Sequence, residues 1–102
     1  MTILEEIQKE RNKQDEKWGE QNHPFVAFSP HYGSYSANYA REQCDNAFNQ
    51  GVGDWRYILN EEVYEAYEQA AHKNVEKFRE ELIQVAAVVV AMIECLDRNG
   101  LK

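Results

Sequence analysis

The stretch WRYILNEEVYEAYEQAAHKNVEKFREELIQVAAVVVAMIECL, residues 55–96, decides the fold of this chain. Apolar residues recur in it three and four positions apart, which places them on one face of an α-helix. A short polar turn at residues 73–74 separates two such patterns. The apolar run at residues 85–93 is far too short to cross a bilayer, so we expect a buried helix. The stretch therefore predicts two long helices, at residues 55–72 and 75–99.

Carboxylates lie on the side of each predicted helix that should be buried. Glu62 and Glu65 are three residues apart, so they share one side of the first helix with its apolar positions. Glu81 is aligned in the same way with Val85 and Met92 on the second helix. Ionised carboxylates are seldom buried without a partner, and three of them would repel one another. Hard divalent cations take such oxygen ligands, so the sequence predicts a site for Mg²⁺ or Mn²⁺.

Length and charge narrow the classes of function. The 102 residues suit a single domain, residues 1–102, with one hydrophobic core. The chain has 18 acidic and 11 basic residues, a formal net charge of -7, and no cluster of Lys or Arg. We therefore expect no nucleic-acid polymer as a partner. A small phosphate ligand bridged by a metal is compatible with this charge.

The N-terminus and the cysteines indicate the compartment. Residues 1–6 have neither the basic region nor the long apolar region of a secretory signal, so we expect a cytoplasmic protein that does not enter a membrane. Cys44 and Cys95 are the only cysteines, and each lies on the apolar side of a predicted helix. We expect them to be free core thiols.

The first half of the chain predicts two more helices around a loop. Thr2 and Glu5 have the spacing of a capping box, which starts a helix at residues 2–17 that packs by one edge. Residues 19–35 follow no helical or strand period but contain several aromatic residues, so we expect a loop that closes over a ligand. A second helix is predicted at residues 36–49, and its inner face comprises Ala37, Ala40, Cys44, Ala47 and Phe48.

The class predicted from these patterns is all-α, because no stretch alternates as a strand does. The last helix is apolar nearly all round, more than the core of one small monomer can cover. We therefore expect the chain to form a homo-oligomer, with a homodimer as the first expectation.

Two sequence elements resemble a known family. Glu61-Glu62-Val63-Tyr64-Glu65, followed by Glu80-Glu81 on the next helix, resembles the E-x-x-E and E-x-x-D signature of the MazG-like, all-α nucleoside triphosphate pyrophosphohydrolases. Glu62, Glu65 and Glu81 match the signature, whereas Gln84 stands where the family has Asp. The chain is also similar to phage and bacterial members that begin with Arg-x-x-Gln-Asp-x-x-Trp-Gly, matched by Arg11, Gln14, Asp15, Trp18 and Gly19, and that carry Trp55 ahead of the acidic pair.

The resemblance implies a compact four-helix domain that hydrolyses a nucleoside triphosphate to monophosphate and pyrophosphate with Mg²⁺. Glu62, Glu65 and Glu81 would be metal ligands, one of them also activating water. Gln84 would be a weak ligand, because an amide oxygen carries no charge and cannot act as a base. Candidates for binding the substrate are Lys77 and Arg79 for phosphate, and Trp55 and Trp18 for a nucleobase. Each of these four has an alternative role, as a surface charge or as a core or interface aromatic.

Two other functions are compatible with the sequence. The chain could bind or sequester a nucleotide without cleaving it, since Gln84 replaces an acidic residue. It could also be a structural helical adaptor whose acidic face binds a basic partner. A separate alternative to a metal site is that Glu61, Glu62 and Glu65 form a solvated face with Lys73 and Lys77 nearby. The inward carboxylates and the aromatic loop favour a nucleotide over the adaptor.

Overall fold

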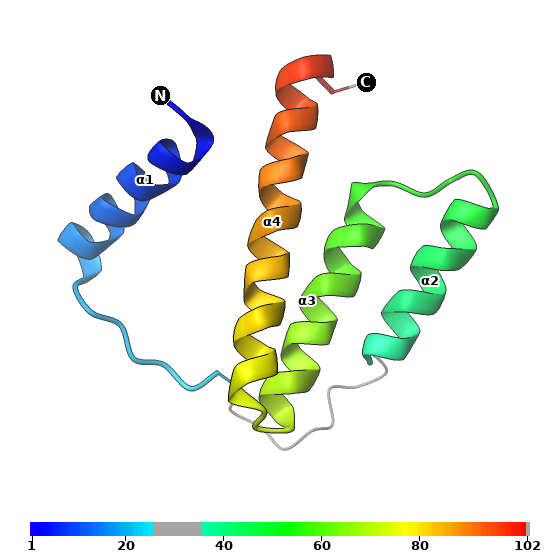
Figure 1. The fold of residues 1–102 in the computed structure, drawn as a ribbon, viewed down its shortest axis with the longest axis horizontal. Helices are drawn as coiled ribbons and strands as arrows, with labels where there is room; N and C mark the ends of the chain where they lie inside the picture. The colour runs from blue at the N-terminus through cyan, green and yellow to red at the C-terminus, as the bar shows by residue number, and fades with distance from the viewer. Residues whose placement is uncertain (26–35, 102) are drawn as a thin grey trace.

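The computed structural model describes residues 1–25 and 36–101, which form α1 (Ile3–Trp18), α2 (Ala37–Asn49), α3 (Trp55–Ala71) and α4 (Val75–Asn99) (Figure 1). The described residues contain no strand, so the predicted all-α class is confirmed. Residues 19–25 of the predicted loop contain no helix, whereas residues 26–35, and with them most of the proposed lid, lie outside the described part.

Side-chain caps start each helix close to the predicted residue. The Thr2 hydroxyl accepts the Glu5 N–H at 3.1 Å, and Thr2 N–H donates to the Glu5 carboxylate at 3.2 Å, which confirms the capping box. Ser36, Asp54 and Asn74 each accept a backbone N–H from the first turn of the helix that follows. These local hydrogen bonds explain why the first residue of each helix differs from the prediction by at most one position.

The core lies where α3 passes between α2 and α4 (Figure 1). Among residues 1–25 and 36–101, the buried residues are all small: Ala37, Ala40, Cys44, Ala47 and Ala66. Small side chains let helix backbones approach closely, as the sequence predicted for the inner face of α2. Phe48 was wrongly placed on that face, since it is 48% exposed. Its ring lies instead against Gly53, where the absence of a Cβ leaves room for it.

Helix α1 stands apart from the other three (Figure 1). None of its residues, all of which the structure describes, is buried. Ile7 of α1 and Ile93 of α4 line a shallow hollow between the two helices. The radius of gyration is 15.9 Å, against about 13 Å for a compact chain of about 100 residues. The four helices are therefore less closely packed than the sequence predicted, because the narrow apolar stripe of α1 offers little area to bury.

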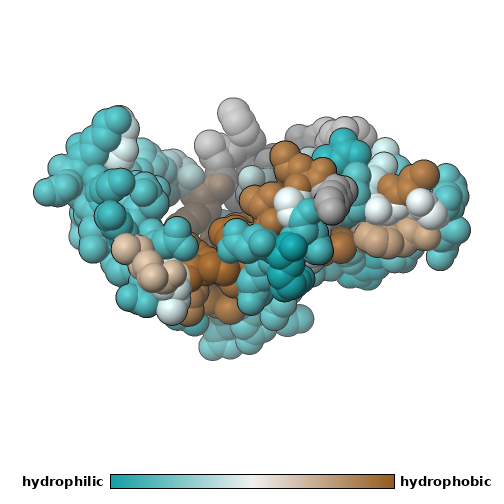
Figure 2. All heavy atoms as spheres, turned by 90° about the horizontal axis from the view of Figure 1, so that it is seen from above, coloured by the Kyte–Doolittle hydropathy of each residue, from teal (hydrophilic) through white to brown (hydrophobic). Residues whose placement is uncertain are grey.

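Helix α4 is not the buried helix that its apolar sequence predicted. It packs on α3, and none of its 25 residues is buried. Ile83 is 55% exposed and Leu96 is 46% exposed, and Figure 2 shows apolar side chains open to solvent in the middle of the molecule. The expectation that one chain cannot cover this helix is thus confirmed, while pairing with a second copy stays a prediction. Among the described residues, no helix combines the length and apolarity that a membrane span needs.

Candidate metal centre

The structure brings together the three carboxylates that the sequence singled out. Glu62 and Glu65 of α3 and Glu81 of α4 each offer one carboxylate oxygen, and these oxygens lie within 4.8 Å of one another. All three residues are partly buried. They meet because α3 and α4 are joined by the short turn at residues 72–74, where Lys73 adopts a left-handed conformation with φ of 58°. The convergence predicted from helical spacing is confirmed.

The electrostatics of this acidic cluster, Glu62, Glu65 and Glu81, show unbalanced negative charge. Burial raises the pKa of Glu62 above its ordinary 4.5, and the charges of Glu65 and Glu81 raise it further. Burial also raises the pKa of Glu81, followed by the charge of Glu65. In addition, Oε2 of Glu81 is buried without a hydrogen-bond partner. Such an oxygen lacks the compensation that buried polar groups normally have.

A divalent cation fits this donor set. Carboxylate oxygens are the ligands that Mg²⁺ and Mn²⁺ prefer, and the three residues offer one such oxygen each within 4.8 Å of one another. The alternative of a fully solvated acidic face is disfavoured, because each of Glu62, Glu65 and Glu81 is partly buried.

Arg41 of α2 is a neighbour of the cluster that the sequence analysis missed. Its guanidinium donates to Glu65 Oε1 at 3.0 Å and lies 3.5 Å from Glu61 Oε1. Residues 36–55 contain no other Lys or Arg. That isolated cation was the available signal, but its partner lies 24 residues further along the chain. Helical spacing relates residues on one helix and cannot reveal such a pair.

The first half of α4 carries the two residues predicted to bind phosphate and the one predicted to be a weak metal ligand. Lys77 is one turn before Glu81, and its charge lowers the pKa of Glu81. Gln84 is one turn after Glu81 and has an exposed side chain, so its role as a weak ligand stays a prediction. Arg79 lines a separate groove of about 410 Å³ together with Phe25 and Phe78, whose rings meet edge to face at 5.3 Å. Of these residues, Lys77 has the clearest electrostatic link to the cluster.

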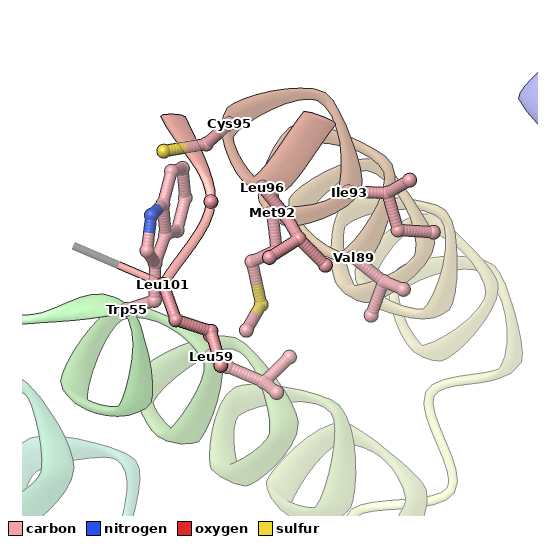
Figure 3. A pocket seen from close by; sticks show the side chains of 9 residues that line it. Trp55, Leu59, Val89, Met92, Ile93, Cys95, Leu96 and Leu101 are labelled. Carbon is pink, nitrogen blue, oxygen red and sulfur yellow. The ribbon is translucent and has the colours of Figure 1, made fainter. Parts of the chain in front are cut away.

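The two tryptophans occupy different parts of the molecule. Trp55 begins α3 and lines an apolar pocket of about 610 Å³, where Cys95 lies beside its ring and Met92 lies across from it (Figure 3). Glu62 is seven residues further along α3, about 10 Å by helical rise. Trp18 ends α1, is 61% exposed, and has the Lys17 ammonium 4.8 Å from its ring centroid. Contact of either ring with a nucleobase stays a prediction.

Both cysteines are free thiols, as predicted, but only Cys44 lies in the core, whereas Cys95 is partly exposed. Burial raises the pKa of Cys44 to about 11, and hydrogen bonding to Glu61 contributes. Its thiol is therefore protonated at neutral pH and is a poor metal ligand. The pKa of Cys95 is lowered, first by a hydrogen bond with Trp55.

Comparison of the chain with models of known protein families, with curated proteins and with solved structures finds no match. The functional argument therefore depends on the geometry of the described residues. Within that geometry the acidic cluster is the feature that points most directly to a ligand.

The raised pKa values of Glu62 and Glu81 predict how stability depends on pH. The folded protein binds protons more tightly at these groups than the unfolded chain does. Their stabilising contribution is therefore complete below the ordinary value of 4.5 and is lost as the pH rises through the raised values. In a chelator, Glu62→Gln should gain stability relative to wild type as the pH increases from 4.5 toward neutral.

The measurement is the melting temperature of both proteins across this pH range. The comparison with Glu62→Gln is necessary because Glu5 and Asp54 have lowered pKa values and impose the opposite trend on wild type and variant alike. Parallel curves for the two proteins would contradict the expected effect of Glu62.

Proposed function

We propose that this protein is a Mg²⁺-dependent nucleoside triphosphate pyrophosphohydrolase, which converts a ribo- or deoxyribonucleoside triphosphate to its monophosphate and pyrophosphate. The observation that carries the proposal is the meeting of Glu62, Glu65 and Glu81, whose carboxylate oxygens lie within 4.8 Å of one another. The match of these same residues to the MazG-like signature supports the choice of reaction. An adaptor function would not need carboxylates that burial makes costly to ionise.

Glu62, Glu65 and Glu81 would hold Mg²⁺ or Mn²⁺, which when bound polarises phosphate oxygens and offsets their charge. The chain would supply the proton acceptor for the attacking water. One of these three carboxylates would take this role, as the family resemblance implies. Water adds across the bond between the α and β phosphates, and the products are the monophosphate and pyrophosphate.

Cationic and apolar residues around the cluster would bind the rest of the substrate. Lys77 is the first candidate for a phosphate contact, since it already influences Glu81. Arg79 would be a second contact, and Trp55 or Trp18 would stack on the base. The exposed apolar side of α4 supports assembly into a homodimer or larger homo-oligomer. We propose the cytoplasm as its compartment.

Gln84 supports a second candidate function, binding or sequestering a nucleotide without cleavage. It stands where the family signature has Asp, and its neutral amide can neither act as a base nor add charge to the cluster. In this case the cluster would hold a metal and nucleotide together, and turnover would be slow or absent.

The proposal is tested by a pyrophosphate-release assay across canonical and modified nucleotides, with Mg²⁺, with Mn²⁺ and with a chelator. We expect release that requires the metal and is abolished by Glu65→Gln. Gln84→Asp should tighten Mn²⁺ binding and raise the rate, because it restores a charged oxygen one turn from Glu81. Gln43→Asp, at an exposed position on α2, makes the same chemical change away from α4 and is the matched control.

Nucleotide binding by calorimetry separates the two candidates. Metal-dependent binding without pyrophosphate release would favour the sequestering function. If no nucleotide binds with either metal, both functions are wrong. Weaker Mn²⁺ binding and a lower melting temperature for Gln84→Asp would exclude Gln84 from the metal site.

A further inference from the structure

Two polar contacts join α2 to the acidic side of α3. Arg41 pairs with Glu61 and Glu65, and the backbone N–H of Ala37 donates to Glu68 Oε2 at 3.2 Å. Glu61, Glu65 and Glu68 follow one another at intervals of four and three residues, so they share one side of α3. This side of α3 therefore faces α2 with three carboxylates.

Glu65 belongs to this row and also to the acidic cluster. Arg41 holds its Oε1, and Glu65 also offers an oxygen within 4.8 Å of those of Glu62 and Glu81. The Glu65 side chain is 21% exposed, so solvent screens its charge only in part. Hydrogen bonding to Glu65 raises the pKa of Arg41, so the guanidinium keeps its charge throughout the physiological range. Arg41 is thus a fixed positive charge in direct contact with the cluster.

We propose that Arg41 is the internal counter-cation of the acidic cluster, which holds Glu65 when no metal is bound and competes with a divalent cation for this carboxylate. The inference rests on the metal site of the proposed function. Because coupling between two interactions is reciprocal, a cation that binds Glu65 weakens its pairing with Arg41. Metal binding therefore loosens α2 at Arg41, while the Glu68 contact and the buried alanines keep this helix in place.

If Arg41 instead orients Glu65 for metal binding, its removal should change the metal affinity in the opposite direction. Groups that hydrogen-bond to metal ligands often orient them, and their removal typically weakens metal binding about 10- to 100-fold. A counter-cation does the reverse, because its removal leaves the carboxylates more negative and raises their affinity for a cation. The direction of the change in metal affinity thus distinguishes the two roles.

The test measures Mn²⁺ affinity by calorimetry, together with the melting temperature in a chelator. We expect Arg41→Gln to bind Mn²⁺ about three- to tenfold more tightly and to melt at a lower temperature without metal. Arg41→Lys keeps the positive charge, so its Mn²⁺ affinity should remain close to that of wild type. This variant still tests the proposal if Arg41→Gln does not fold. Arg98→Gln removes the same charge 17 residues from Glu81, about 25 Å along α4, and should change Mn²⁺ affinity little.

Weaker or unchanged Mn²⁺ binding by Arg41→Gln would overturn the proposal, as would a wild type that binds no Mn²⁺. If Arg41→Gln does not fold, an Arg41→Lys protein with weaker Mn²⁺ binding than wild type would overturn it equally. A protein that binds Mn²⁺ but releases no pyrophosphate would disprove the proposed reaction alone, and the role of Arg41 would stand on its affinity data.

Discussion

Replacing Glu81 with glutamine should raise the melting temperature of the metal-free protein and remove most of its response to Mg²⁺ or Mn²⁺. The substitution keeps the shape of the side chain and removes a charge that burial and Glu65 make costly. If removal of this charge increases the free energy of unfolding by about 1 kcal/mol, the melting temperature rises by roughly 4–8 °C. Wild type should in turn be stabilised by a cation that binds only the folded protein. Thermal melts with a chelator and with millimolar metal measure both effects.

Glu80→Gln is the matched control for this prediction. Glu80 is the preceding residue on α4, is exposed, and loses the same charge in the substitution. It should leave the metal response unchanged. If Glu81→Gln melts no higher than wild type without metal and responds equally to the cation, then Glu62, Glu65 and Glu81 do not share a site.

Ala66→Leu should destabilise the fold strongly. Ala66 is 2% exposed, the lowest value among the described hydrophobic residues of the core, and lies on the helix that contacts both α2 and α4. A larger side chain must separate these helices or adopt a strained rotamer, which costs about 1–3 kcal/mol. A domain with so few buried residues has little stability to lose, so we expect melting to fall by roughly 10 °C.

The control for this substitution is Ala87→Leu on α4, where the alanine is exposed. It adds the same atoms without entering the core. The free energy of unfolding should therefore change by less than about 0.5 kcal/mol, and the melting temperature should change little. Equal melting of Ala66→Leu and wild type would mean that α2 and α3 do not pack as the structure has them.

The helices could be predicted from the sequence because their signals are local. Thr2, Ser36, Asp54 and Asn74 each cap the helix that directly follows, and Gly100 ends α4 with φ of 65°. The packing was less predictable. Neither the separation of α1 nor the exposure of α4 can be deduced from hydrophobic periodicity, which identifies an apolar face but not what covers it.

The candidate site was partly predictable for the same reason. Glu62 and Glu65 share a side by helical period, and a short turn brings Glu81 back beside them. Arg41 joins them only through the packing of α2 on α3, which no spacing within one helix encodes. The carboxylates were therefore found in the sequence, whereas the cation that compensates them was not.

The turn between α3 and α4 sets the alignment of the site. Lys73 is eight residues from Glu65 and eight from Glu81, and eleven residues from both Glu62 and Gln84. The two helices thus form a nearly symmetric hairpin around this residue. One residue added there would rotate Glu81 by about 100° around its helix and shift it by about 1.5 Å along the axis. The length of this connection is therefore as much a determinant of the cluster as the three glutamates themselves.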